Sequence, residues 1–243
     1  MATSKKQASA KATPPPEKER RKRRTMSQSD TIEFWTDEDF FVSQRKIYLG
    51  SIQTDAESNE SNVDAAMSKK FEKAMTVLEY FDKKSPITII LNTYGGDYYH
   101  GLAIYDRIMD SPCFVTIQGT GPIMSMGAII LQAGDKRLLT RNATLMLHYG
   151  TSGHDGHMLN EERAAQENTR LRLLAEEIFL GQMQKKDPSI TLEKVRDLLR
   201  FDSFFDPNKA IRLGLADGLT PRTKHRKAKT TPPPQPAPQT PSS

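Results

Sequence analysis

The sequence predicts an α/β domain built around a largely parallel sheet. Short apolar runs typical of buried strands alternate along the chain with segments of helical periodicity, and the connections between them are short. The chain has 243 residues, of which 36% are hydrophobic. That length suffices for one sizeable domain and little more.

The first half of the chain contains two predicted strands and two predicted helices. Apolar residues recur at helical spacing from Val63 to Phe81. The continuous apolar run of residues 86–92 predicts a strand buried on both faces. The predicted order is strand 47–52, a polar loop at 54–62, helix 63–81, strand 86–92, a Gly-Gly turn within 93–101 and helix 101–109.

The second half repeats this alternation and then changes character. The predicted order is strand 113–119, a Gly121–Pro122 turn, helix 125–133, strands 136–140 and 143–148, a long helix 157–185, a short helix 191–200 and a closing segment 206–220. The long helix is highly charged and too long for this core to cover. It is therefore expected to project and to pack on another subunit.

Both ends of the chain are expected to be disordered. Residues 1–27 carry a charge of +7 and residues 221–243 a charge of +5, so residues 28–220 carry −7 of the chain's total of +5. Polar, proline-rich tracts bury too little apolar surface to offset the entropy of ordering. The expected domain is thus 28–220. The tails either solubilise it or make weak, salt-sensitive contacts with nucleic acid or an acidic partner.

Several classes of protein are disfavoured by composition. The one cysteine, Cys113, allows no disulfide framework and no cysteine zinc site, and it is expected to be a buried strand residue. No apolar run approaches the roughly 20 residues of a membrane span, and the basic start of the chain lacks the apolar core of a secretory signal. A cytoplasmic protein without membrane contact is expected.

Two turns are candidate sites, because ligands of parallel α/β sheets bind beyond the carboxyl ends of the strands. One is Gly95-Gly96, and the other leads through Gly121 to Ser125. Ser125 stands at a predicted helix start, where unpaired amides favour negative charge. It is either a helix cap or a nucleophile.

A serine nucleophile needs a base, and the base needs an orienting carboxylate. His148 closes a predicted strand on the edge where the two turns lie, although a lone histidine is more often structural. Asp202 and Asp206, in "RFDSFFD", are both candidate carboxylates, and each could instead cap a loop.

Four motifs in this order resemble the Clp protease proteolytic subunit family (ClpP, serine peptidase family S14). They are "NTYGGDYYHGLAIYD", "GPIMSMGAIILQAGDKR", "ATLMLH" and "FDSFFDPNKAIRLGLADGL". The resemblance covers roughly residues 45–220. The family's aspartate lies two residues before a Phe, which favours Asp202 over Asp206.

The resemblance implies a serine endopeptidase with the ClpP/crotonase-like ββα superhelix fold. It implies that Ser125 is the nucleophile, His148 the general base and then acid, and Asp202 its orienting carboxylate. The amides of Gly96 and Met126 would form the oxyanion hole.

For the assembly, the resemblance implies a double heptameric ring zipped by the handle helix 157–185 and fed with unfolded polypeptides by an AAA+ ring ATPase. No G-x-x-x-x-G-K-[ST] motif is present, so ATP would act only through that partner. No cofactor and no metal are expected in this chain.

The sequence also departs from the family pattern. Tyr149-Gly150 follows the histidine where Gln-Pro is common, Ile123 and Met124 replace small residues before the serine, and residues 95–100 are bulkier than usual. The alternatives are a non-catalytic scaffold subunit, a specialised protease (for example for capsid maturation) that works without an ATPase, and a crotonase-type acyl-CoA enzyme.

Overall fold

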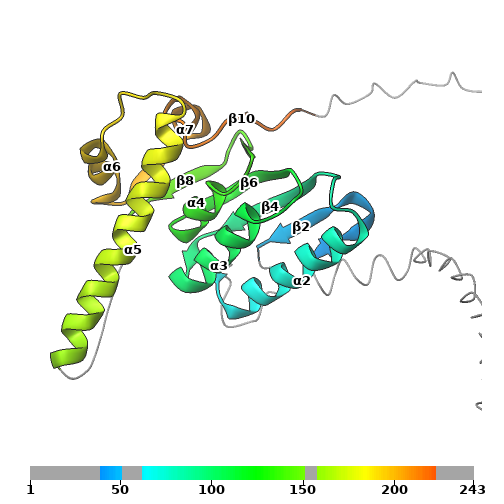
Figure 1. Ribbon diagram of the computed structural model, residues 1–243. Coiled ribbons are helices and arrows are strands. Elements are labelled where there is room, and N and C mark those ends of the chain that lie inside the picture. Colours follow the sequence, from blue (N-terminus) through cyan, green and yellow to red (C-terminus); the bar gives the residue numbers. More distant parts are fainter. Residues whose placement is uncertain (1–38, 51–61, 151–157, 223–243) are drawn as a thin grey trace, which may run out of the picture.

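The computed structural model describes residues 39–50, 62–150 and 158–222. The tail 1–27, the polar loop 54–61 and nearly all of the tail 221–243 lie outside these residues. An eight-stranded sheet runs in the order β1-β2-β4-β6-β7-β10, with β8 paired to β6 and β9 paired to β8 (Figure 1). All neighbouring strands are parallel except β1–β2 and β8–β9. The predicted α/β class is confirmed.

The strands are β1 Phe40–Phe41, β2 Lys46–Leu49, β4 Ile87–Thr93, β6 Val115–Met124, β7 Lys136–Leu139, β8 Thr144–Leu147, β9 Ser203–Phe205 and β10 Gly218–Leu219. A separate parallel pair consists of β3 Asn62–Val63 and β5 Gly95–Gly96. The helices are α2 Ala65–Phe81, α3 Tyr98–Met109, α4 Met126–Leu131, α5 Met158–Gln184, α6 Leu192–Leu199 and α7 Pro207–Arg212, with a 3-10 turn at Val42–Gln44.

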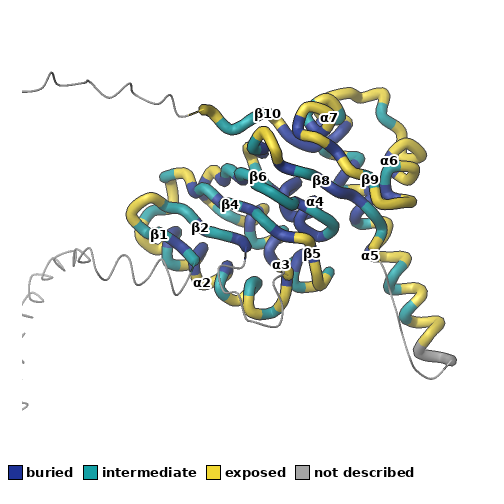
Figure 2. The backbone as a smooth tube through the Cα atoms, turned by 180° about the vertical axis from the view of Figure 1, so that it is seen from behind, coloured by how far each residue is buried: buried dark blue, intermediate teal, exposed yellow. Residues whose placement is uncertain are grey.

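The central strand β4 is buried on one face only, which corrects the prediction of burial on both faces. Its residues alternate strictly, with Ile87, Ile89 and Leu91 inaccessible and the residues between them intermediate. Helices α2, α3 and α4 lie over the buried face (Figure 1), and the view from behind shows the strands of the opposite face (Figure 2). The run looks continuously apolar because Ile90 lies on the less buried face of a strand that packs on one side only.

Strand β6 continues through the predicted Gly121–Pro122 turn, which is a second correction. Gly121 has φ +63°, and the register against β4 shifts between Leu91 and Thr93. Before this kink β6 pairs with β7, and after it Pro122 to Met124 pair with β8. The Gly-Pro pair bends the strand toward a new neighbour without ending it.

The long predicted helix is confirmed as α5, which projects from the body of the domain (Figure 1). From Glu161 on, where burial is described, its buried residues lie in the second half of the helix, where it meets the core: Leu171, Ala175, Glu176, Phe179 and Met183. Within the described ranges, no helix has the length and apolar character needed to cross a membrane.

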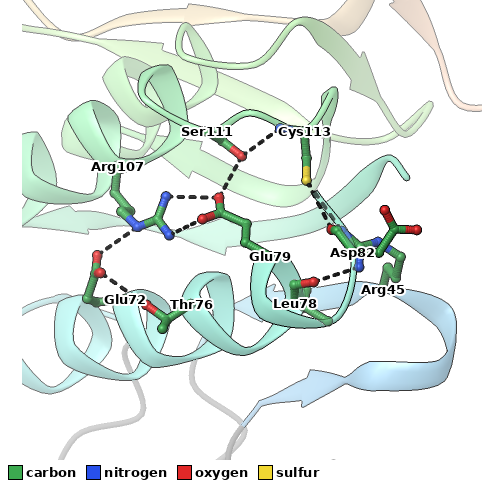
Figure 3. Close-up of polar contacts among 9 residues, drawn as sticks. All are labelled: Arg45, Glu72, Thr76, Leu78, Glu79, Asp82, Arg107, Ser111 and Cys113. Atoms are coloured by element: carbon green, nitrogen blue, oxygen red, sulfur yellow. Dashed lines mark hydrogen bonds and ion pairs between the residues drawn. The ribbon is translucent and has the colours of Figure 1, made fainter. Parts of the chain in front are cut away.

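Arg45 lies between the edge strands β1 and β2 and connects this hairpin by hydrogen bonds to the end of α2 (Figure 3). Its guanidinium donates to the carbonyl oxygens of Leu78, Asp82, Ser85 and Pro86. It also lies 3.4 Å from the thiol of Cys113, which is 3% exposed. Cys113 is buried as predicted, but it precedes β6 by two residues rather than lying within the strand.

Candidate active site

Ser125 lies between the end of β6 and the start of α4 in a strained backbone conformation. Its φ of 52° and ψ of −120° are unusual for a residue with a side chain. Its amide donates to the Met146 carbonyl at 3.0 Å, which fixes the turn against β8. The serine occupies the N-cap position, yet its side chain makes no capping hydrogen bond. The hydroxyl therefore does not cap α4, in contrast to the helix-cap alternative.

His148 follows β8 directly and faces this hydroxyl. Because β8 pairs in parallel with the last residues of β6, the two strands end side by side, with Met124 opposite Met146. The Nε2 atom of His148 lies 2.8 Å from Oγ of Ser125. The imidazole is 22% exposed, so one edge remains open to solvent.

Asp202 lies on the other side of the imidazole. Strand β9 runs antiparallel to β8 with Ser203 opposite Leu147, and this register sets Asp202 beside His148. The Oδ1 atom of Asp202 is 3.0 Å from Nδ1 of His148. Asp206, the other candidate, instead accepts a hydrogen bond from the Lys209 amide at 2.9 Å and caps α7.

The Gly95-Gly96 pair, predicted as a turn, forms the short strand β5 and packs directly against the serine. A Cβ atom on Gly95 would lie 2.6 Å from Cβ of Ser125 and 3.1 Å from the amide nitrogen of Met126. Gly95 and Gly96 also have φ values of +111° and +142°. The Asp97 amide donates to the Val63 carbonyl oxygen at 2.8 Å, which ties the end of this segment to β3. Both positions thus require glycine, and β5 lies directly against the start of α4.

The arrangement can activate the serine. When Nδ1–H of His148 donates to Asp202, Nε2 is left as the acceptor for the Ser125 hydroxyl proton. Amides at a helix start favour the negative charge that develops on an attacked carbonyl oxygen. Among the described residues there is no cluster of His, Cys, Asp and Glu that could hold a metal ion. Fold and site together define the class of serine hydrolases.

Comparison with known proteins agrees with this class. The Clp protease family model matches residues 52–223. The ATP-dependent Clp protease proteolytic subunit of Deinococcus radiodurans is 31% identical over 168 residues, which are 68% of this chain and 79% of that protein. The chloroplastic ATP-dependent Clp protease proteolytic subunit 6 of Arabidopsis thaliana is 30% identical over 162 residues, which are 65% of this chain and 57% of that protein. The chain belongs to the Clp protease family, and its class of activity is that of a serine endopeptidase.

Glu176 and its contact with Tyr149, close to the site, were not predicted from the sequence. Glu176 on α5 is 2% exposed and accepts a hydrogen bond from the hydroxyl of Tyr149, the residue after His148. Burial and this hydrogen bond raise the pKa of Tyr149 to about 12. The sequence gives one weak signal, since Glu176 lies at a core-facing position of a charged helix and Glu177 beside it is exposed.

Proposed function

We propose that Ser125, His148 and Asp202 hydrolyse peptide bonds of polypeptide substrates through an acyl-enzyme. Ser125 is the nucleophile, His148 is the general base and then the general acid, and Asp202 orients the imidazole and stabilises its charged form. The amides of Gly96 and Met126 form the oxyanion hole.

In the first half of the reaction, Oγ of Ser125 attacks the carbonyl carbon while Nε2 of His148 takes the hydroxyl proton. The carbonyl oxygen becomes an oxyanion beside the two amides. When the C–N bond breaks, His148 returns the proton to the leaving amine and the ester remains on Ser125. Water, deprotonated by His148, then hydrolyses the ester and regenerates the serine.

The proposal rests above all on the pair of distances at His148. Contacts of 2.8 Å to Ser125 and 3.0 Å to Asp202 lie within hydrogen-bond range on both sides of one imidazole. These residues come from three separate segments of the chain. A non-catalytic scaffold subunit has no need of this alignment, and an acyl-CoA enzyme of the crotonase type needs no such triad.

We further propose the family's assembly for this chain, a double heptameric ring zipped by α5 and supplied by an AAA+ ATPase. The relatives are named as proteolytic subunits of ATP-dependent proteases, which supports a separate ATP-hydrolysing partner. In this proposal the chain itself needs no cofactor. Sedimentation of the purified protein tests the assembly, and peptide release with and without the partner ATPase tests the coupling.

Fluorophosphonate labelling followed by peptide mapping tests the proposed chemistry. The wild-type protein should be labelled at Ser125, and both Ser125→Ala and His148→Ala should stay unlabelled. Ser189→Ala is the matched control, because this exposed hydroxyl donates to Asp187 within its own turn. Absence of label on the assembled wild-type protein would refute the proposal.

A further inference from the structure

Glu176 is a buried carboxylate at the point where α5 meets the core. It is 2% exposed and lies between Ala175, at 3%, and the exposed Glu177. Carboxylates are almost never buried to this extent without paired charges and hydrogen bonds. The contacts of Glu176 therefore indicate what it holds together.

The two oxygens of Glu176 reach two different segments of the site. Oε1 accepts the hydroxyl of Tyr149 at 2.7 Å, and Oε2 accepts Nε–H of Arg196 at 2.9 Å. Tyr149 follows His148 in the chain, and Arg196 lies on α6, whose end leads into Asp202. One carboxylate thus bridges the segment that carries the base and the segment that precedes its orienting carboxylate.

A second arginine reinforces the Tyr149 side of this bridge. Arg172, one turn before Glu176 on α5, lies with Nε 3.9 Å from Oε1 of Glu176. Its guanidinium also lies over the Tyr149 ring, 5.2 Å from the centroid. The tyrosine is therefore held at its hydroxyl by a carboxylate and on its ring face by a cation.

Glu176 and its partners lie beyond the end of the hydrogen-bonded ladder between β8 and β9. The β8–β9 pairing extends to Leu147 and Ser203, so His148 and Asp202 lie just beyond it. On the far side, the Tyr149 amide donates to the Leu199 carbonyl at 2.9 Å. His148 and Asp202 are thus enclosed between the last ladder pair and the contacts around Glu176.

We infer that Glu176 is a positioning residue for the hydrolytic reaction, acting through Tyr149 and Arg196 to hold His148 and Asp202 in register. The inference rests on the proposed roles of these two residues. Glu176 acts through its two partners, because its carboxylate oxygens accept from Tyr149 and Arg196. Its effect is confined to how often the imidazole occupies the geometry that lets it take the serine proton.

Two substitutions each disrupt the bridge. Glu176→Gln removes the negative charge that pairs with Arg196 and leaves one acceptor oxygen where Tyr149 and Arg196 each donate to their own, so the two contacts can no longer both be kept as they are. Tyr149→Phe keeps the ring and removes the hydroxyl, so the β8 contact is lost. Glu177→Gln is the matched control, because it makes the same chemical change one residue away on the exposed face.

The rate of fluorophosphonate inactivation and the steady-state cleavage of a peptide are the activity readouts. Glu176→Gln should lower the inactivation rate and kcat by about 10- to 100-fold while KM stays within about twofold. Tyr149→Phe should have a smaller effect in the same direction, and Glu177→Gln should match the wild type. Unfolding curves should show that each variant is folded under the conditions of the activity measurements.

The tautomer of His148 provides a readout independent of activity. In ¹⁵N-histidine-labelled protein, with the signal assigned through His148→Ala, the wild type should show one tautomer with the proton on Nδ1. Glu176→Gln should show a mixture of tautomers, and Glu177→Gln should not. A merely structural residue would lower the unfolding temperature without changing the tautomer of the folded protein.

The outcomes separate the inference from the proposed function. If the wild type is labelled and Glu176→Gln keeps its inactivation rate and its single tautomer, the positioning role is wrong and the proposed function stands. If the wild type is not labelled, the proposed function fails, and the tautomer comparison still decides whether Glu176 orders His148.

Discussion

Helices α3 and α4 begin at the same edge of the sheet, after the neighbouring strands β4 and β6, but their first residues differ. Asp97 caps α3 in ordinary extended backbone, and its side chain accepts the His100 amide at 2.9 Å. Ser125 precedes α4 with a positive φ and no capping contact. A side chain that the local backbone does not use is free to meet a partner from elsewhere in the chain, and in Ser125 that partner is His148.

The uncapped start of α4 carries a cost that packing must offset. A lost N-cap destabilises by about 1 kcal/mol, and a strained non-glycine φ by about 1–3 kcal/mol. Every residue of α4 from Met126 to Leu131 is buried, including Ile130 and Leu131 with no accessible surface. The strained turn is thus held between a fully buried helix and the strand pairing of β6.

The largest expected effect separates the two candidate aspartates. Asp202→Asn should lower kcat by about 10²- to 10⁴-fold, because the neutral amide no longer fixes the histidine tautomer. Asp206→Asn, which keeps a capping oxygen at the start of α7, should leave kcat near the wild-type value. Steady-state peptide cleavage measures both. Equal losses in the two variants would contradict the assignment.

The next largest effect breaks the strained turn itself. Gly95→Ala should lower the inactivation rate by about 100-fold and the free energy of unfolding by at least about 2 kcal/mol, because the new Cβ would lie 2.6 Å from Cβ of Ser125 at a φ of +111°. Gly181→Ala is the control. It lies on α5, and among the described residues no atom beyond its chain neighbours and the adjacent helix backbone lies within 4 Å of the added Cβ, so helix stability should rise slightly.

The comparison of the two helix starts can be sharpened in equilibrium unfolding. Asp97→Ala should lower the free energy of unfolding by about 1 kcal/mol through loss of the cap. Ser125→Ala should change it by less than about 0.5 kcal/mol, since no cap is removed and the φ remains positive. Urea titration of both variants decides the point, and a Ser125→Ala loss as large as that of Asp97→Ala would show that the hydroxyl stabilises α4 after all.

The smallest expected effect is on the acid dependence of stability and concerns Glu79 on α2. Burial would raise the pKa of Glu79, but hydrogen bonds from Arg107 and Ser111 (Figure 3) outweigh it and hold the pKa below its ordinary value of 4.5. A depressed folded-state pKa gives stability that is present above pH 4.5 and is lost as the pH falls through the folded value. Unfolding between pH 7 and pH 3 should show a weaker acid dependence in Glu79→Gln than in the wild type.

The sequence predicted the individual helices and strands better than it predicted how they pair and pack. Strand and helix order could be read from local periodicity, because burial of each segment leaves its own pattern. The continuation of β6 past Gly121 could not be read this way, since it depends on β8 arriving as a new pairing partner. The one-sided burial of β4 likewise depends on which face the helices cover.

The candidate site shows the same division. Ser125, His148 and Asp202 were selected by motif and resemblance, and the structure brings their side chains into contact. Glu176 was not selected, because its core-facing position is only a weak signal in a helix that carries so many charged residues. Its significance comes from Tyr149 and Arg196, which lie 27 and 20 residues away in the chain.

The bonding of β6 also has a consequence for behaviour on heating. This strand pairs with β4, β7 and β8, so its amides should be among the last to exchange with deuterium, and Ser125 directly follows its last residue. Asp202 depends on the three-residue ladder between β8 and β9. Peptide cleavage should therefore be lost on warming through local opening of β9, below the temperature at which the domain melts, and it should return on cooling.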